Sequence, residues 1–232
     1  MQILALDSSG LVASVAIVDE EQTLAEYTIN YKMTHSQTLL PMLDEVTKIM
    51  GFDLSSIDAI AISGGPGSFT GLRIGSATAK GLGMALEKPL IHIPTLDGLA
   101  YNLCGNTGLI CPIMDARRNQ VYTGVYRCQN DLEIVEKQMA IDIEELIAVL
   151  NKAQEQVTFL GDGVPVYREI IENKLKVPVV FAPLHMNRQR AAAVGALGIC
   201  YYKDGKIETA KDHKPDYLRL SQAERERMEK EA

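Results

Sequence analysis

The most distinctive segment of the chain is a run of glycines between an apolar stretch and a helical pattern. It reads Gly64-Gly65-Pro66-Gly67-Ser68-Phe69-Thr70-Gly71. A glycine-rich turn before a helix can bind an anion such as phosphate, because backbone N–H groups converge there. The segment is not a P-loop, and no acidic strand follows about 20 residues later as in a dinucleotide fingerprint. Anion binding and a purely structural turn are both compatible with these residues.

Two aspartates stand at the ends of short apolar stretches and could take part in ion binding. Asp7 follows Ile3–Leu6, and Asp115 follows Leu109–Met114. A carboxylate at such a place could hold a magnesium ion through water. A turn or cap aspartate has the same local pattern, and the spacing alone favours it.

Histidines and cysteines give no metal or redox motif. The histidines are His35, His92, His185 and His213, and none forms an H-x-x-x-H or H-E-x-x-H pattern. We therefore expect no metal site built by this chain. The cysteines are Cys104, Cys111, Cys128 and Cys200, with no C-x-x-C spacing. They are expected to be buried, reduced thiols of a cytosolic protein.

The helical pattern after the glycine turn carries a small residue at every fourth position. The row consists of Gly71, Gly75, Ala79 and Gly83. Each interior glycine costs a helix about 1 kcal/mol relative to alanine, so the narrow face should serve a close contact. Packing within the chain and packing against a partner helix both remain open.

The elements that position these residues follow a plan that occurs twice. The first half is predicted to contain strands Ile3–Leu6, Val12–Val18 and Thr23–Asn30, helix Ser36–Met50, strand Ile57–Ser63, a helix to Leu86, strand Pro89–Ile93 and helix Leu96–Leu103. The second half is predicted to contain strands Leu109–Met114, Val121–Arg127 and Glu133–Met139, helix Ile143–Lys152, strand Val157–Leu160, helix Val166–Leu175, strand Val177–Phe181 and helix Gln189–Lys203. These assignments rest on apolar periodicity and on turn residues.

Each half thus has the order βββ-α-β-α-β-α. This order predicts an α/β protein of two tandem ribonuclease H-like halves, the actin/Hsp70/sugar-kinase (ASKHA-type) architecture. We place the halves at residues 1–106 and 107–232, with the boundary in the break at 105–108. In this architecture Asp7, Ser9, Gly67 and Asp115 would line a nucleotide cleft. We expect that cleft to be degenerate, because Arg117-Arg118 stand where a phosphate-binding hairpin needs bare backbone.

Composition narrows the class of protein further. The 232 residues carry a net charge of −7, with 47% hydrophobic and 23% charged residues. These values fit a globular protein and argue against a stand-alone nucleic-acid binder. Local arginines, Arg117, Arg118, Arg188 and Arg190, could still contribute to contact with RNA. The longest apolar stretch, 191–202, is too short for the roughly 20 residues of a membrane span, so we expect a cytoplasmic protein with no membrane contact.

Several segments in order resemble the TsaB (YeaZ-like) family over essentially the whole chain. They are LALDSSGLVASVAIV, HSQTLLPMLDEV, GGPGSFTGLRIGSATAKGLGMAL, KPLIHIPTLDGLA, PIMDARRNQVYTGVY, GDGVPVY and PDYLR. The string GPGSFTGLRIG is the most specific of them. The resemblance implies a non-catalytic subunit needed for threonylcarbamoylation of adenosine 37 in tRNA. It also implies pairing with the catalytic subunit TsaD and with the ATPase TsaE, and a homodimer when the chain is alone.

The resemblance also implies what this chain lacks and where it binds. TsaD holds a metal with two histidines on a helix, and the matching positions here are Thr95 and Leu99, so ATP and the metal would belong to the partner subunits. Family members pair through first-half helices, here 36–50 and 70–86. The interface residues implied are Leu39, Leu43, Val46, Gly71, Gly75, Ala79 and Gly83.

Two other classes of function stay open at this point. An actin-like ATPase or small-molecule kinase is motivated by Asp7, Asp115 and the glycine turn. A glycoprotease-like peptidase is less favoured, because the sequence offers neither metal ligands nor a Ser/His/Asp arrangement.

Overall fold

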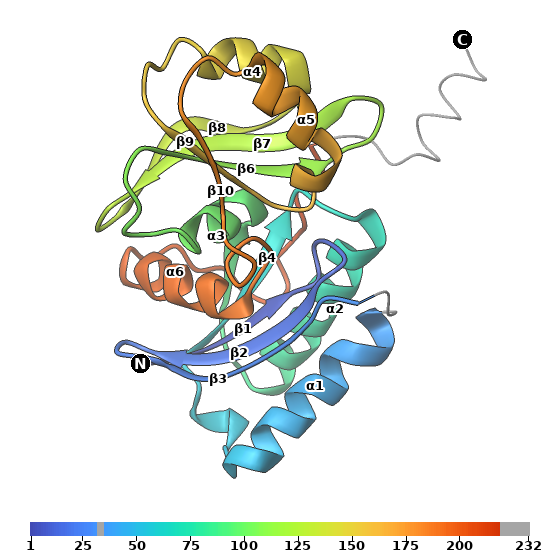
Figure 1. Cartoon of the computed structure of the whole chain (residues 1–232). Coiled ribbons are helices and arrows are strands. Elements are labelled where there is room, and N and C mark those ends of the chain that lie inside the picture. Colours follow the sequence, from blue (N-terminus) through green and yellow to red (C-terminus); the bar gives the residue numbers. More distant parts are fainter. Residues whose placement is uncertain (32–34, 219–232) are drawn as a thin grey trace, which may run out of the picture.

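The computed structural model describes residues 1–31 and 35–218, and it consists of two five-stranded sheets stacked with helices around and between them (Figure 1). Arg219, the last residue of the PDYLR motif, lies outside the described residues. Within the described part, no helix combines the length and apolar character needed to cross a membrane.

The two sheets have the same topology, which confirms the predicted repeat. The first has the order β3-β2-β1-β4-β5 and the second the order β8-β7-β6-β9-β10 when it is read in the same direction. In each half, three antiparallel strands are followed by two strands parallel to the first. The strands are β1 (Gln2–Asp7), β2 (Ala13–Asp19), β3 (Thr23–Ile29), β4 (Ala59–Gly65), β5 (Leu90–Pro94), β6 (Leu109–Asp115), β7 (Gln120–Cys128), β8 (Leu132–Asp142), β9 (Val157–Leu160) and β10 (Val179–Phe181).

Helices cover both outer faces of the stack and fill the layer between the two sheets. They are α1 (His35–Met50), the 3₁₀ turn η1 (Leu54–Ser56), α2 (Phe69–Ala85), α3 (Thr95–Tyr101), α4 (Ile143–Leu150), α5 (Val164–Lys174) and α6 (Ala191–Lys203). One core lies between the first sheet and α1 and α2, and another between the second sheet and α4 and α5. Side chains along β1 point alternately to the two faces of the sheet. Leu4 and Leu6 pack toward α1 and α2, whereas Ile3 and Ala5 pack toward α6.

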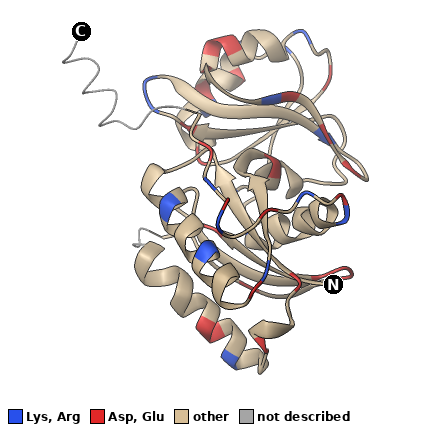
Figure 2. Cartoon of the chain, turned by 180° about the vertical axis from the view of Figure 1, so that it is seen from behind, with Lys and Arg blue, Asp and Glu red and all other residues tan. Residues whose placement is uncertain are grey.

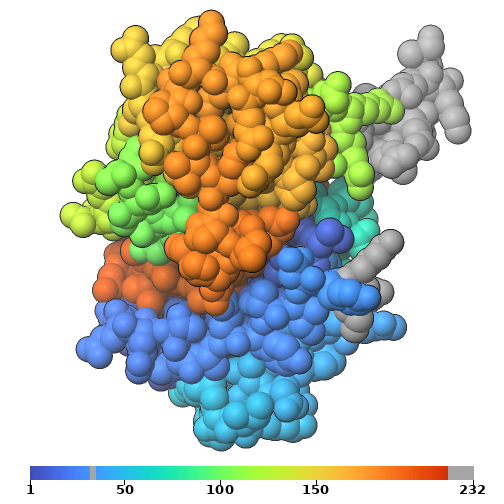
Figure 3. All heavy atoms as spheres, in the orientation of Figure 1, coloured from blue at the N-terminus to red at the C-terminus, as the bar shows by residue number. Residues whose placement is uncertain are grey.

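The third helix of each half packs against the sheet of the other half. Helix α3 lies on β6 and β7 through Leu96, Leu99 and Leu103, and α6 lies on β1, β2 and β5 through Val194 and Leu197. Both helices therefore occupy the layer between the sheets (Figure 1). The space-filling view shows the orange chain before α6 wedged between the blue first half and the green and yellow second half (Figure 3). The polypeptide passes from one sheet to the other between α3 and β6, but α6 returns to the first.

Two of the four cysteines are bonded to each other, which corrects the expectation of four reduced thiols. Cys104, just after α3, forms a disulfide with Cys128 at the end of β7. The link joins the last turn of the first half to the second sheet. Cys111 is a free buried thiol, as expected, whereas Cys200 is free but exposed.

A buried aspartate on α3 connects that helix with α6 and with β7 of the second sheet. Asp97 accepts hydrogen bonds from the Tyr126 hydroxyl on β7 at 2.8 Å and from the Tyr201 hydroxyl on α6 at 3.1 Å. Burial raises the pKa of the Asp97 carboxyl, and the two tyrosine bonds oppose that rise. These two donors stabilise a carboxylate that is only 2% exposed.

Tyr126→Phe should therefore lower the free energy of unfolding by about 2 kcal/mol, because a hydrogen bond to a buried charged group is lost. Tyr27→Phe, on the partly exposed edge strand β3, is the matched control and should change the stability by less than about 0.5 kcal/mol. Urea denaturation of the three proteins measures both values. Equal stability of the two variants would show that the Asp97 bond does not hold the halves together.

Candidate functional site

Asp7 at the end of β1 is enclosed by donors from its own loop and from β4. The Ser9 backbone N–H and the Ser9 hydroxyl donate to Asp7 Oδ1 at 2.8 and 2.7 Å, and the Ser63 hydroxyl donates to Oδ2 at 2.5 Å. Burial raises the pKa of the Asp7 carboxyl, while these hydrogen bonds pull it down. The side chain is 1% exposed. Asp7 thus organises the loop after β1, and three donors of the chain already occupy most of its acceptor sites.

The glycine turn lies directly against that loop, which explains why it needs glycine. A Cβ at Gly67 would fall within 3.0 Å of the Ser9 carbonyl oxygen, and one at Gly71 would fall as close to the Ser8 carbonyl oxygen. The Ser8 hydroxyl donates to the Gly71 carbonyl at 2.9 Å, and the Ser68 N–H donates to the Ser9 carbonyl at 2.7 Å. The fold brings together Asp7, Ser9 and Gly67, which were predicted as nucleotide contacts. Asp7 and Ser9 are hydrogen-bonded to each other, and the Gly67 backbone packs against the Ser9 carbonyl.

Asp115 at the end of β6 lies in a different loop. It accepts the Arg117 backbone N–H at 2.9 Å and the Tyr167 hydroxyl at 3.2 Å, and the Arg117 guanidinium lies 3.7 Å from its other oxygen. Arg117, Arg118 and Asn119 all have positive φ angles, of 66°, 55° and 60°, which side chains other than glycine adopt at a cost. A cavity of about 620 Å³ lies beside this loop, and its lining combines acidic and basic residues: Asp115, Asp142, Glu144 and Glu169 with Arg117, Arg118 and Lys174.

The structure places the seven predicted interface residues on the inward faces of α1 and α2. Leu39, Leu43, Val46 and Ala79 belong to the core against the first sheet. A Cβ at Gly75 would lie within 3.0 Å of the Ser8 hydroxyl, and Gly83 approaches the Cβ of Ala210. Of the two interpretations of the Gly/Ala row, the contacts show packing within the chain. A partner that approaches these helices meets other side chains.

The outward face of the same helices carries a second row that the sequence analysis missed. Arg73, Ala77, Gly81 and Ala85 are exposed at every fourth position of α2. A Cβ at Gly81 would have nothing within 4 Å, so no contact inside the chain explains that glycine. Beside this row, Met84 is 67% exposed. On α1, Leu40 and Ile49 are 52% and 76% exposed, and because they are nine residues apart they lie on opposite sides of that helix. The two rows have the same four-residue spacing in the sequence, and only the fold shows that one faces inward and the other outward.

Thr95 and Leu99, at the positions of the TsaD histidines, serve the packing of α3. The Thr95 hydroxyl accepts the Gly65 N–H at 3.1 Å, and Leu99 is in the core beneath the second sheet. Neither side chain supplies a ligand that could take the role of imidazole. These residues do not fit a metal held in the manner of TsaD.

Basic residues in the described part are interspersed with acidic ones rather than gathered in one patch (Figure 2). Arg188 donates to the carbonyls of Gly161 and Asn187, and Arg190 pairs with Glu26 on β3. Both arginines, which the sequence offered as RNA contacts, are thus bound within the chain.

Known structures with the same architecture identify the fold class of the chain. The architecture of two ribonuclease H-like halves is shared with a polyphosphate/ATP-glucomannokinase from Arthrobacter sp. strain KM, with a TM-score of 0.52 and 13% identity over 88% of this chain and 99% of that one. The fold is therefore that of the actin and sugar-kinase class. YeaZ from Pseudomonas aeruginosa matches with a TM-score of 0.77 and 27% identity, over 94% of this chain and 99% of that one.

The family follows from the sequence matches. The Bacillus subtilis protein named "tRNA threonylcarbamoyladenosine biosynthesis protein TsaB" is 32% identical over 97% of this chain and 96% of its own length. The family model described as TsaD, tRNA N6-adenosine threonylcarbamoyltransferase, matches residues 22–227. The chain belongs to the TsaB (YeaZ-like) family.

The inward contact of α2 predicts opposite effects for two glycines of one helix. Gly71→Ala should destabilise the protein by about 1–3 kcal/mol, because the new methyl group would overlap the Ser8 carbonyl. Gly81→Ala should stabilise it by about 0.5–1 kcal/mol, since alanine is the better helix former and the space is open. Thermal and urea unfolding measure the pair, and a neutral Gly71→Ala would refute the tight contact.

Proposed function

We propose that this chain is a non-catalytic partner subunit in the threonylcarbamoylation of adenosine 37 in tRNA, pairing with TsaD and acting together with the ATPase TsaE. Membership of the TsaB family supports the pathway, and the match to the TsaD family model supports a shared fold between the proposed partners. The observation that carries the pairing is the outward face of α1 and α2, with its exposed apolar side chains and its unexplained exposed glycine.

The residues of the expected nucleotide cleft support a role without chemistry of its own. The donors around Asp7 come from Ser9 and Ser63, and the Asp115 carboxylate is bound by Arg117 and Tyr167. A kinase or ATPase would need these carboxylates to bind the magnesium ion of a nucleotide. In the proposed assembly ATP and the catalytic metal belong to the partner subunits, and the chain supplies a rigid surface.

That surface is suited to the close approach of a helix. The small side chains of Ala77 and Gly81 leave the backbone of α2 exposed between Arg73 and Met84. A partner helix can pack closely on such a face. Helix α1 packs beside α2, and one of its exposed apolar side chains, Leu40 or Ile49 on opposite sides of α1, would add apolar contact area next to this face. The same face would pair with a second copy when TsaD is missing, so the isolated chain is proposed to be a homodimer.

The net charge of −7 fits a subunit that reaches tRNA only through its assembly. Arg188 and Arg190 are bound inside the chain, so they offer little to a phosphate backbone. We accordingly place tRNA binding on the partner subunits and the complex in the cytoplasm.

Ala77→Arg tests the proposed face. The residue is exposed on α2, so the variant should fold normally, while the long charged side chain should weaken pairing with TsaD by about 30-fold or more, the effect of a central interface residue. Titration calorimetry with purified TsaD and a threonylcarbamoylation assay with tRNA are the measurements. The proposed interface predicts loss of both pairing and stimulation.

Ala148→Arg on α4 is the matched control, because it makes the same exchange at an exposed helix position of the other half. It should leave pairing and activity unchanged. Tight pairing by Ala77→Arg would place the interface elsewhere. Equal activity of TsaD and TsaE on tRNA with and without this chain would refute the proposed function itself.

A further inference from the structure

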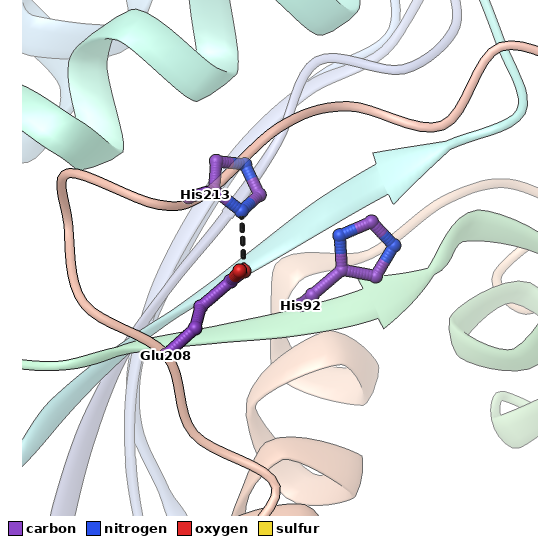
Figure 4. Close-up of side chains that lie close together, drawn as sticks. All are labelled: His92, Glu208 and His213. Carbon is purple, nitrogen blue, oxygen red and sulfur yellow. Dashed lines mark hydrogen bonds and ion pairs between the residues drawn. The ribbon is translucent and has the colours of Figure 1, made fainter.

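Two of the four histidines, far apart in sequence, meet in the fold beside a glutamate. His92 lies on β5, and Glu208 and His213 lie on the segment that follows α6. One potential ligand atom from each residue lies within 4.8 Å of the other two. Figure 4 shows the three side chains converging on one space. The sequence analysis expected no such site, because the spacing of the histidines carries no motif.

Backbone pairing fixes where these side chains stand. Leu90 and Glu208 exchange both backbone hydrogen bonds at 2.9 Å, which ties the C-terminal segment to the edge strand β5. His92 is two residues beyond Leu90 and so stands on the same side of the strand. The imidazole of His92 occupies the place where a Cβ of Gly64 would be, so the first residue of the glycine turn makes room for it.

The polar atoms of this cluster are only partly satisfied. His213 Nδ1 lies 2.6 Å from Glu208 Oε1, and the His213 side chain is fully buried. The Nε2 atom of His213 is buried and has no hydrogen-bond partner among the described residues, whereas the buried Nε2 of His92 has the Asp216 carboxylate 3.3 Å away. A buried polar atom without a partner, such as His213 Nε2, indicates a bound group such as water or an ion.

We propose that His92, Glu208 and His213 bind one divalent transition-metal ion, with Zn²⁺ as the fitting choice. Two imidazoles and a carboxylate are a ligand set that zinc accepts, with a fourth position left to water. Ligand atoms in such a site are about 3.3 Å apart when each lies about 2.0 Å from the ion. Small side-chain rotations would bring the three groups to that geometry.

The surroundings provide an outer shell and an entry path. Asp216 Oδ2 lies 3.3 Å from His92 Nε2, while the other ring nitrogen of His92 faces Glu208 and His213 (Figure 4). A carboxylate behind a metal-binding histidine is the usual outer partner of zinc ligands. A cavity of about 330 Å³, lined by His92, Pro94, Tyr201, Lys206, Ile207 and Glu208, opens toward the site. Lys80 donates to the His213 carbonyl at 3.1 Å and is the nearby cation that the ion must tolerate.

The metal would fasten the C-terminal segment to the first half. In the same segment, Ala210 packs against Gly83 and Asp216 packs against Gly65. The proposed ion therefore lies between two close contacts of this segment with the first half. This role is independent of the pairing proposed above, because His92, Glu208 and His213 lie outside the exposed row of α2.

The test uses the untagged full chain with Cys200→Ser in every protein, since the exposed Cys200 thiol could bind zinc by itself. Calorimetric titration with ZnCl₂ should give one site with a micromolar or lower Kd. His92→Asn and Glu208→Gln should each weaken binding by about 100-fold or more, because loss of even an outer partner costs 10–100-fold. His185→Asn, which removes an exposed histidine elsewhere, should leave the Kd unchanged.

Co²⁺ titration gives a second readout, with the visible absorption bands of a tetrahedral site expected in the parent and absent in Glu208→Gln. Zinc should raise the melting temperature of the parent and not that of Glu208→Gln. Urea midpoints without metal establish that the variants fold. Absence of zinc binding at millimolar concentration, or equal Kd values for parent, His92→Asn and Glu208→Gln, would overturn the site.

Discussion

The rest of the first half depends on one contact, in which the backbone of the glycine turn lies against the loop after β1. Gly67 and Gly71 meet the carbonyl oxygens of Ser9 and Ser8 at distances that no Cβ would allow. Asp7 holds that loop in place from beneath through Ser9 and Ser63. The contact sets the position of α2 on the sheet, and therefore decides which face of α2 is left outside. The structural role of the glycines and the position of the proposed partner surface are thus consequences of the same packing.

The second half repeats this device with different residues, as expected for a duplicated fold. Gly161 follows β9 with φ of 106°, and a Cβ there would overlap the Ile113 carbonyl of β6. The Gly163 N–H donates to that carbonyl at 3.0 Å, and Asp162 accepts the Asp115 N–H. The turn after the fourth strand thus packs on the loop that follows the first strand in the first half, and on the first strand itself in the second half.

Sequence periodicity was sufficient for the topology, because strand and helix patterns are local and occur in the same order twice. The residue-level assignment of the interface depended on what α2 packs against, and the inner row from Gly71 and the outer row from Ala77 have the same spacing. Pairing between distant residues had no local signal at all. The Cys104–Cys128 bond and the meeting of His92 with His213 depend on the return of the chain across the sheets. Likewise, the pattern predicted α6 itself, but not that its apolar side covers the first sheet.

The path of the C-terminal segment explains why the two halves cannot be regarded as independent units. The backbone of β5 would be an open edge of the first sheet, and Glu208 pairs with it at Leu90. Further along, the Asp216 N–H donates to the Gly64 carbonyl at 2.6 Å, where the glycine at position 65 leaves room for the passing backbone. Residues that follow α6 in the second half therefore complete the edge of the first half and contact the glycine turn. The turn is fixed between two segments from the two ends of the chain, so the surface of α2 depends on both halves being folded.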